Sequence, residues 1–476
     1  MTTSASQLKV ENDLAVAAQE RVRLAVEILR QRMGERVQTG VEIRRQHGHT
    51  LTSLPNQPPD AVVFARSTDE VCEIVSVAHK HNVPVIAFGG GTSLEGHVNA
   101  PNGGISLDLT GMSAIVEVYS SDMQAVVQAG VTREQLNIHL RDCGLFFAVD
   151  PGAETATIGG MAATRASGTN TVRYGTIREN VVNVTAVMAN GDVVKTANRA
   201  AKSSAGYDLT HLLVGSEGTL GIITELTVKL HPRPEKIAAA VAPFKSLQGA
   251  CDATIEARQL GLGLARIELM DSLLVKTVNA HAKLDLDEAP TLFLEFHGST
   301  ASVGEAVETF RELADAHGAV RYDWADRPEE RSALWHARHE TLWAVKSYWP
   351  GQETLVTDVC VPISNLAKCV VETQKDLEET GLIGPIVGHV GDGNFHVVLV
   401  HDPNDTDQRA KITGWLNRLT ARAIAMDGTC TGEHGIGQGK TRFLQDELAS
   451  AVPVMKSLKQ ALDPLGILNP GKIFKS

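Results

Sequence analysis

Residues 84 to 97 read PVIAFGGGTSLEGH, an apolar run typical of a strand that leads into a loop with four glycines. Glycine has no Cβ, so backbone N–H groups of such a loop can converge on an anion such as a diphosphate. A Rossmann site needs the spacing G-x-G-x-x-G at the start of a helix, but here the turn and strand NAPNGGISLDL follow. The loop disfavours a nicotinamide site, and on its own it is also compatible with an ordinary turn.

The sequence before this loop predicts the opening of an α/β domain. AVVF at 61–64 is typical of a strand and DEVCEIVSVAHKHN at 69–82 of a helix, so a strand, a helix and a second strand follow one another. Further upstream, a helix over residues 13–34 is predicted from four apolar side chains at helical spacing, Val22, Val26, Leu29 and Met33.

The sequence after the loop indicates how the chain is divided. Short strand patterns continue to HPRPE at 231–235, which marks a boundary, and alternating helix and strand patterns beyond it predict a separate α+β unit. The C-terminal run LDPLGILNPGKIF has the composition of a loop that docks back onto the first domain. We expect four parts: a helical segment (1–53), a first domain (54–232), a substrate or cap domain (233–425) and a docking segment (426–476).

Two further segments are rich in glycine and small residues. They are VDPGAETATIGGMAATRASGTNTVRYGTIREN at 149–180 and GYDLTHLLVGSEGTLGIIT at 206–224. Such composition indicates that the backbone approaches something large and flat. In this order and spacing, the three segments resemble the FAD-binding domain of the vanillyl-alcohol oxidase and p-cresol methylhydroxylase superfamily, and the C-terminal half resembles its FAD-linked oxidase C-terminal domain.

This resemblance implies an α+β fold, with an FAD-binding domain of two subdomains and a C-terminal α+β domain built on an antiparallel sheet. Thr92 and Ser93 follow the three consecutive glycines, and no cysteine lies between 144 and 250, so we predict non-covalent FAD. The residues implied to bind it are Phe88, Gly89, Gly90, Gly91, Thr92, Ser93, Gly96, Asp150, Pro151, Gly152, Thr157, Ile158, Gly159, Gly160, Ala163, Ser167, Gly168, Tyr174, Gly175, Gly221, Ile222, Asn394, Glu433 and Asn469.

IVGHVGDGNFHVVLV at 386–400 carries a hairpin signal, because Asp-Gly lies between runs rich in Val, Ile and Phe. A two-residue turn at 392–393 would make His389 and His396 direct cross-strand neighbours, with Cβ atoms about 4.5 to 5.5 Å apart. Two imidazoles so placed can bind one metal ion, whereas a lone strand histidine is usually a core residue.

A carboxylate for this ion is expected from GTCTGEHGIGQGKT at 428–441, which contains Glu433. Two imidazoles and one carboxylate leave coordination positions open, as in catalytic sites. The alternatives are a solvated loop or a phosphate loop. A phosphate-binding loop is excluded because its pattern G-x-x-x-x-G-K-[ST] requires a glycine at the position that His434 occupies here.

Both motifs resemble those of the FAD-dependent D-2-hydroxyacid dehydrogenases, which oxidise D-lactate, D-2-hydroxyglutarate or glycolate. The resemblance implies metal ligands at His389, His396 and Glu433, a zinc or manganese ion, and His434 as the catalytic base. It also implies that Arg338, in ERSALWHARHE, binds the substrate carboxylate beside Trp335. Hydride transfer to FAD would leave a 2-oxo acid, with electrons passed on to a cytochrome or quinone-type acceptor.

The same resemblance bears on the substrate. Where the 2-hydroxyglutarate enzymes have Thr, Lys and Asn against the substrate, this chain has Leu342, Val356 and Val398. A second carboxylate would be left unpaired there, at a cost of several kcal/mol. We therefore expect D-lactate or another short to medium apolar D-2-hydroxy acid, with D-2-hydroxyglutarate or glycolate as the alternative. A metallohydrolase, or a module that only binds flavin or metal, is the alternative from another class.

Composition excludes other classes. The 476 residues carry 44 Lys and Arg against 56 Asp and Glu, a net charge of −12 without any basic run, so we expect no nucleic-acid partner. Six cysteines without a C-x-x-C pair indicate reduced thiols. The N-terminus lacks a secretion-signal pattern, which predicts a cytoplasmic protein. Peripheral membrane contact and a homodimer stay open.

Overall fold

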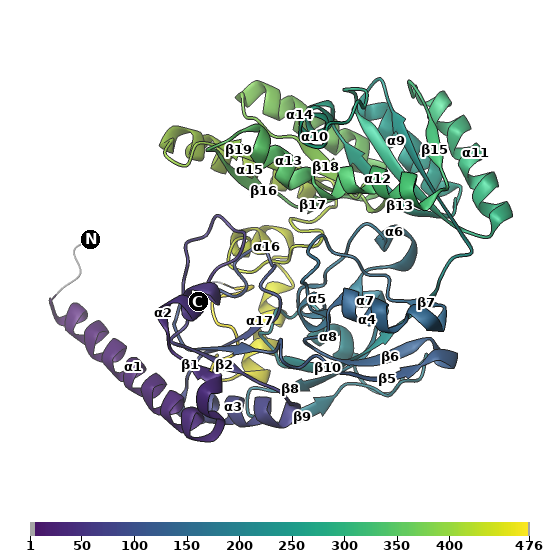
Figure 1. The fold of residues 1–476 in the computed structure, drawn as a ribbon. Coiled ribbons are helices and arrows are strands. Elements are labelled where there is room, and N and C mark those ends of the chain that lie inside the picture. The colour runs from purple at the N-terminus through teal and green to yellow at the C-terminus, as the bar shows by residue number, and fades with distance from the viewer. Residues whose placement is uncertain (1–4, 475–476) are drawn as a thin grey trace.

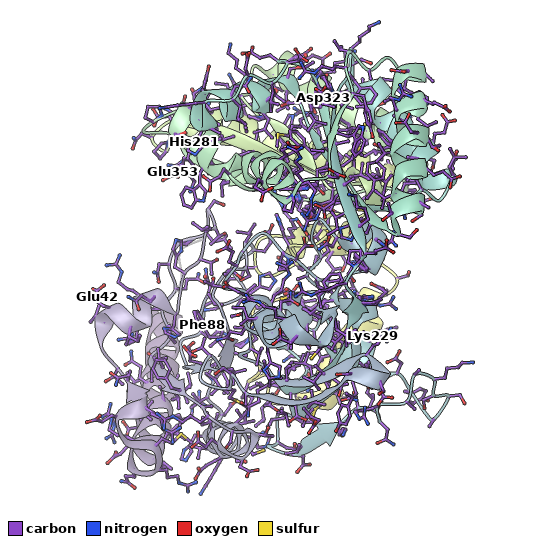
Figure 2. The ribbon with its side chains drawn as sticks, turned by 45° about the vertical axis from the view of Figure 1, so that its right-hand side comes forward. Glu42, Phe88, Lys229, His281, Asp323 and Glu353 are labelled. Atoms are coloured by element: carbon purple, nitrogen blue, oxygen red, sulfur yellow. The ribbon has the colours of Figure 1, made fainter. Side chains whose placement is uncertain are left out.

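The computed structural model describes residues 5–474, which form two lobes joined along one side (Figure 1). The first lobe holds the N-terminal half and the last segment of the chain, and the second lobe holds the elements between them. Figure 2 shows the same two lobes with their side chains, with Phe88 in the first lobe and His281 and Glu353 in the second. The structure is thus a mixture of helices and sheets, as predicted from the sequence.

The chain begins with a long helix, α1 (Ala5–Met33), that packs along α3 (Thr68–His81). It starts earlier than the predicted residue 13, because no proline or glycine interrupts the sequence before it. Its apolar stripe is confirmed where it meets the first lobe, since Val26, Leu29 and Met33 are buried there.

The first sheet carries the glycine loop that follows residue 88. Its strand order is β1-β2-β4-β3, with β2, β4 and β3 parallel and α3 connecting β2 to β3. The predicted strand, helix and strand are confirmed to within one residue. The elements here are β1 (Val37–Gln38), α2 (Val41–Gln46), β2 (Ala61–Phe64), β3 (Val85–Phe88) and β4 (Ile105–Asp108).

The second sheet of the first lobe is antiparallel, in the order β5-β6-β10-β8-β9. It shares one hydrophobic core with the first sheet. The elements are β5 (Ile115–Tyr119), β6 (Gln124–Gln128), α4 (Arg133–His139), β7 (Leu145–Phe146), α5 (Ile158–Thr164), α6 (Thr171–Tyr174), α7 (Ile177–Asn180), β8 (Val181–Val187), β9 (Val193–Lys195), α8 (Leu209–Leu213), β10 (Ile222–Lys229) and β11 (His231–Pro232).

The second lobe is built on an antiparallel sheet of eight strands in the order β15-β12-β14-β13-β18-β19-β16 along its main path, with β17 beside β19. The strands are β12 (Lys236–Pro243), β13 (Leu264–Met270), β14 (Thr291–Gly298), β15 (Asp323–Ala325), β16 (Glu353–Val356), β17 (Val359–Cys360), β18 (Ile386–Gly388) and β19 (Asn394–His401). Strand alternation gives this sheet two apolar faces, and helices cover both.

One face of this sheet packs against a large cluster that includes α9 (Leu247–Gln259), α11 (Thr300–Ala316), α14 (Leu366–Thr380) and α15 (Thr406–Ala425). The other face packs against α10 (Ser272–Ala282), α12 (Pro328–His339) and α13 (Thr341–Tyr348). The candidate substrate residues therefore lie on this side of the sheet, on α12, α13 and the strands β16 and β19.

The C-terminal segment returns to the first lobe, where α16 (Thr441–Glu447) and α17 (Val452–Leu462) appear in yellow (Figure 1). Leu468 forms a parallel bridge to Val85, beside the glycine loop. Lys459 Nζ donates to the carbonyl of Thr219 at 2.8 Å. In the part of the chain that the structure describes, no helix has the length and apolarity needed to span a bilayer.

Candidate functional site

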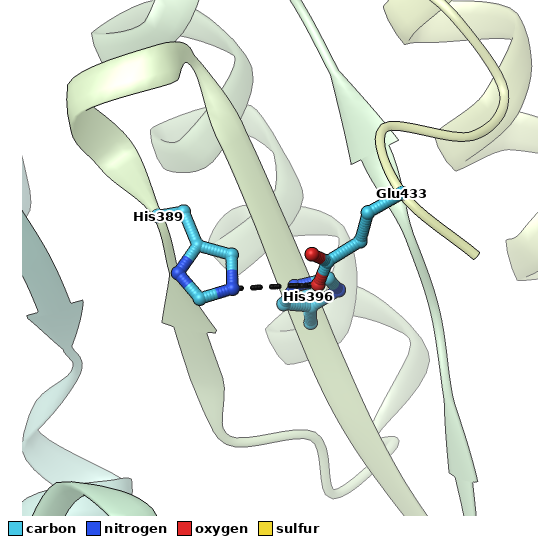
Figure 3. A group of neighbouring side chains, drawn as sticks. All are labelled: His389, His396 and Glu433. Carbon is cyan, nitrogen blue, oxygen red and sulfur yellow. Dashed lines mark ion pairs between the residues drawn. The ribbon is translucent and has the colours of Figure 1, made fainter. Parts of the chain in front are cut away.

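Three side chains from two segments converge on one point. Nε2 of His389 lies 3.3 Å from Oε1 of Glu433, and Nε2 of His396 lies 3.2 Å from the same oxygen (Figure 3). The ligand atoms of all three residues lie within 4.8 Å of one another. The side chains are only 7 to 14% exposed, so the structure brings together the predicted trio in a nearly closed setting.

The hairpin that carries both histidines differs from the predicted one. His396 pairs with Val387 rather than with His389, and Val390–Asp392 form a 3₁₀ turn before Gly393. The predicted two-residue turn is wrong because Gly393, at φ 80°, ends a longer turn. The register is offset by two residues, which leaves the side chains on the same face. The two rings therefore still meet, with centroids 5.6 Å apart.

In both histidines, Nδ1, the ring nitrogen that points away from Glu433, is hydrogen-bonded to another group of the protein. Nδ1 of His389 lies 2.7 Å from Oε1 of Glu268, and Nδ1 of His396 lies 2.8 Å from the carbonyl oxygen of Thr357. Each acceptor requires an Nδ1–H, so Nε2 is the ring nitrogen that faces Glu433 and that can bind a cation once its own hydrogen has left. Two Nε2 lone pairs and a carboxylate form a donor set that fits a divalent cation such as zinc or manganese.

The carboxylates and imidazoles of the site shift one another's pKa values. Burial favours the neutral form of Glu433, but His389 and His396 outweigh it and hold the pKa of Glu433 well below its usual range. Burial also acts to lower the pKa of His389, yet Glu268 and Glu433 raise that pKa well above 6.5. A cluster that gathers this much negative charge around two imidazoles is suited to a bound cation.

His434 lies next to the trio. Its ring is nearly parallel to that of His396, with centroids 5.1 Å apart, and its Nε2 is 3.9 Å from Oε1 of Glu433. Burial lowers the pKa of His434 to about 4, so the ring is neutral at pH 7. A neutral imidazole beside a cation site can accept a proton.

Asp358 fixes the backbone around Glu433, and sequence reasoning missed it because it lies in the strand-rich run LVTDVC without a spacing signal of its own. Its Oδ2 accepts the backbone N–H of Glu433 at 3.0 Å and that of His434 at 2.9 Å. Burial acts against ionisation of Asp358, but Lys440 and two histidines lower its pKa far below the usual range. Nζ of Lys440 lies 3.5 Å away and donates to the Asp358 carbonyl.

The predicted substrate arginine has a partner in this structure. Arg338, on α12, donates from Nε and Nη2 to Oε2 of Glu268 at 3.0 and 2.6 Å. Glu268 is fully buried on β13, and sequence reasoning missed it because nothing in the run LARIELM marks it as functional.

The predicted substrate-side apolar residues lie together. Val356 and Val398 are cross-strand partners on β16 and β19. They belong to the same apolar cluster as Leu342 and Trp335. The structure thus brings two residues of the sheet together with one residue from each of the helices α12 and α13 that cover it.

The glycine segments of the first lobe interlock. A Cβ at Gly90 would lie 2.3 Å from the carbonyl oxygen of Thr155, and one at Gly89 would lie 2.5 Å from Oγ1 of Thr157. Only glycine allows this approach. Oγ of Ser93 is buried and has no hydrogen-bond partner among residues 5–474. A polar cradle of closely apposed backbone with an unpaired hydroxyl fits the phosphate end of FAD.

Other predicted cofactor residues have their side chains engaged within the protein. Tyr174 Oη lies 2.7 Å from Nδ1 of His297, and Ile222 is buried in the core. Nδ2 of Asn394 donates to Asp358, and that of Asn469 donates to the carbonyl of Glu217. Asp150 accepts from Thr169 and Asn170, and Ile158 is buried in the core.

Comparisons with known proteins agree with this architecture. Residues 233–473 match the family described as FAD linked oxidases, C-terminal domain, and residues 59–197 match the family described as FAD binding domain. A probable mitochondrial D-lactate dehydrogenase of Danio rerio is 48% identical over 93% of this chain and 89% of its own length. The mitochondrial D-lactate dehydrogenase [cytochrome] of Arabidopsis thaliana is 43% identical over 87% of this chain and 73% of its own length. The structure of p-cresol methylhydroxylase with substrate bound superposes with a TM-score of 0.78 at 17% identity, covering 96% of this chain and 98% of the other.

Proposed function

This chain belongs to the family of FAD-linked oxidases, and from that premise we propose its function. We propose that it oxidises D-lactate to pyruvate, with FAD and one divalent cation as cofactors. The cation would be held by His389, His396 and Glu433, and FAD by the interlocked glycine segments of the first lobe. The observation that carries the proposal is the convergence of two Nε2 atoms and Oε1 beside the neutral ring of His434.

The two cofactors supply separate parts of the chemistry. FAD, which the glycine segments of the first lobe would hold, would supply the acceptor for the hydride of the substrate. A divalent cation, which His389, His396 and Glu433 would hold, would supply a Lewis acid that lowers the pKa of the substrate hydroxyl.

The protein supplies the proton acceptor. His434 takes the hydroxyl proton, because its low pKa keeps the ring neutral at physiological pH. Asp358 holds the backbone of His434 through a hydrogen bond of 2.9 Å, which fixes where the ring can lie. C2 loses a hydride, the hydroxyl loses a proton, and the product is the 2-oxo acid.

The substrate assignment is supported by the apolar cluster. Leu342, Val356 and Val398 offer no hydrogen bond or charge to a second carboxylate, so a short substrate with a methyl group fits better than a dicarboxylate. Arg338 lies one helical turn from Trp335 of this cluster; Glu268 holds one side of its guanidinium, and the other side is proposed to bind the substrate's single carboxylate.

The acceptor of the electrons is also part of the proposal. The Arabidopsis relative carries the word cytochrome in its name, and we extend that acceptor class, with quinones as the alternative, to this chain. The predicted cytoplasmic location stays a prediction.

The deciding experiment is a substrate profile. Purified protein is assayed with an artificial electron acceptor and D-lactate, glycolate or D-2-hydroxyglutarate, while its metal and flavin contents are measured. We expect the highest kcat/KM for D-lactate, a yellow protein, and one metal ion per chain. A higher kcat/KM for D-2-hydroxyglutarate contradicts the substrate assignment, and a colourless protein that hydrolyses esters or amides favours a metallohydrolase.

A further inference from the structure

Glu268 is a fully buried carboxylate to which neither a metal-binding nor a substrate-binding role has been assigned. It lies on β13, in the middle of the eight-stranded sheet, with a side chain only 1% exposed. A carboxylate at such a position is costly unless each oxygen has a partner. The partners therefore indicate why this residue is a glutamate.

The two oxygens of Glu268 serve two different parts of the site. Oε1 accepts from Nδ1 of His389 at 2.7 Å, and Oε2 accepts both donors of Arg338 at 3.0 and 2.6 Å. One carboxylate thus connects a candidate metal ligand on the hairpin with the candidate substrate arginine on α12.

A second contact on the same strand fixes the position of α12. Arg266 lies two residues before Glu268 and so on the same face of β13. Its guanidinium lies over the ring of Trp335, 4.7 Å from the ring centroid. Trp335 and Arg338 are one helical turn apart, so α12 is held against β13 at two neighbouring points.

We infer that Glu268 is a positioning residue that couples cation binding to substrate recognition. Through Oε1 it keeps the hydrogen of His389 on Nδ1 and leaves Nε2 free to bind the cation. Through Oε2 it holds the guanidinium of Arg338 at the edge of the apolar cluster. This inference rests on the proposed function, in which the trio binds a cation and Arg338 binds the substrate carboxylate.

Glu268→Gln tests this inference, because glutamine has the same shape but only one acceptor oxygen. If that oxygen faces Arg338, the amide N–H₂ faces Nδ1 of His389, and a hydrogen is placed on Nε2 toward the cation. If the oxygen faces His389, the amide N–H₂ faces the donors of Arg338. In both orientations one of the two functions is lost.

The measurements are the dissociation constants of Zn²⁺ and Mn²⁺, obtained by equilibrium dialysis of the FAD-loaded protein, and the KM for D-lactate at saturating metal. We expect Glu268→Gln to weaken metal binding, or to raise KM, by about 10- to 100-fold, the usual effect of losing such an outer partner. Unchanged metal affinity together with unchanged KM would overturn the inference.

A matched control is Asp376→Asn. Asp376 is another buried carboxylate of the second lobe that bonds two side chains, Arg418 and Arg422, but it lies on α14 away from the site. We expect this variant to lose thermal stability without a change in metal affinity or KM. If Asp376→Asn shifts these quantities as much as Glu268→Gln does, the effect reflects general destabilisation and the inference is wrong.

Arg338→Met is the second variant, and it applies even if Glu268→Gln fails to fold. It removes the group that orients Glu268 without touching the trio, so we expect a several-fold weaker affinity for Zn²⁺ as well as a higher KM. An unchanged Zn²⁺ affinity would contradict the coupling. If the wild-type protein itself binds neither metal nor D-lactate, the proposed function fails, a result distinct from failure of the coupling alone.

Discussion

Oγ of Ser167 donates a hydrogen bond of 2.6 Å to Oε2 of Glu433, although 266 residues separate them in sequence. Ser167 belongs to the second glycine segment of the first lobe, and Glu433 belongs to the predicted metal trio. The glutamate thus offers Oε1 to the two imidazoles and Oε2 to the lobe expected to bind FAD. This contact places the two predicted cofactor sites next to each other.

Removal of that hydroxyl provides the first prediction. Ser167→Ala leaves Oε2 of Glu433 without its donor, a loss of about 1.5 to 3 kcal/mol for a hydrogen bond to a charged group. We expect metal affinity and kcat, both measured on FAD-loaded protein because Ser167 is also among the residues predicted to bind FAD, each to fall by about tenfold. Metal dialysis and flavin absorbance check this, with Ser203→Ala, at an exposed serine, as the control. Wild-type metal affinity in Ser167→Ala would show that the contact does not matter.

Asp358→Asn tests the support of the catalytic loop. The carboxylate accepts two backbone N–H groups and faces Lys440, and an amide cannot compensate that buried cation. Breaking a buried charge pair costs about 3 to 5 kcal/mol, so we expect a lower Tm and kcat reduced by more than about 100-fold. Calorimetry and steady-state kinetics provide the measurements. A variant with normal kcat would argue against any role of Asp358 in holding His434.

His434→Gln tests the proton acceptor. Glutamine fills much of the same volume but cannot take the hydroxyl proton, and general-base catalysis typically contributes about 10²- to 10⁴-fold. We expect kcat for D-lactate to fall within that range, with metal and FAD contents preserved. If the variant keeps more than a tenth of the activity, another group accepts the proton.

Val398→Asn tests the substrate assignment. Val398 is 3% exposed and pairs with Val356 across the strands beneath α13. An amide at this position offers hydrogen bonds to a second carboxylate, so we expect the ratio of kcat/KM for D-2-hydroxyglutarate to that for D-lactate to rise by about tenfold, or 1.4 kcal/mol. Val397→Asn, on the opposite face of β19, is the control. Equal ratios in wild type and Val398→Asn would place the specificity elsewhere.

Asp271 makes stability depend on pH. It caps α10 by accepting the N–H of Leu274 at 2.8 Å, and burial raises its pKa from 3.8 to about 7. Between these values the folded state binds a proton that the unfolded state has lost, so this contribution to stability declines as pH rises from about 4 to about 7.

Asn also caps helices well but cannot ionise. We expect Asp271→Asn to gain Tm relative to wild type when the pH is raised from 5 to 8, as thermal unfolding at the two values would show. If the difference in Tm between Asp271→Asn and wild type were the same at pH 5 and pH 8, Asp271 would keep its ordinary pKa in the folded protein.

The hairpin at 386–400 shows which features of the site the sequence pattern predicts and which it does not. The pattern in IVGHVGDGNFHVVLV correctly predicted a hairpin that brings His389 and His396 together, although His389 lies just after β18 and only His396 lies within a strand. The register was wrong, because the length of a turn depends on how its backbone packs. Here a Cβ at Gly393 would lie 2.1 Å from the carbonyl oxygen of Val361, a contact that no local pattern reveals.

The two carboxylates that support the site, Glu268 and Asp358, could likewise not be predicted from the sequence. Glu268 and Asp358 lie in ordinary strand sequences, and each contacts a site residue between 70 and 121 positions away. A buried carboxylate in a strand carries no periodic or spacing signal of its own. Only contacts with His389, Arg338 and the backbone of Glu433 identify these two residues.

The sequence by itself determined most of the local elements and predicted, from short patterns, the glycine loops and the trio His389, His396 and Glu433, while the role of His434 was implied only by the family resemblance. It did so because backbone propensity, side-chain periodicity and ligand chemistry are properties of short segments. Tertiary structure alone decided which carboxylates orient those groups, that Arg338 bonds Glu268, and that Ser167 joins the lobes at Glu433. Those contacts join residues far apart in the chain, so they exist only after both lobes have packed.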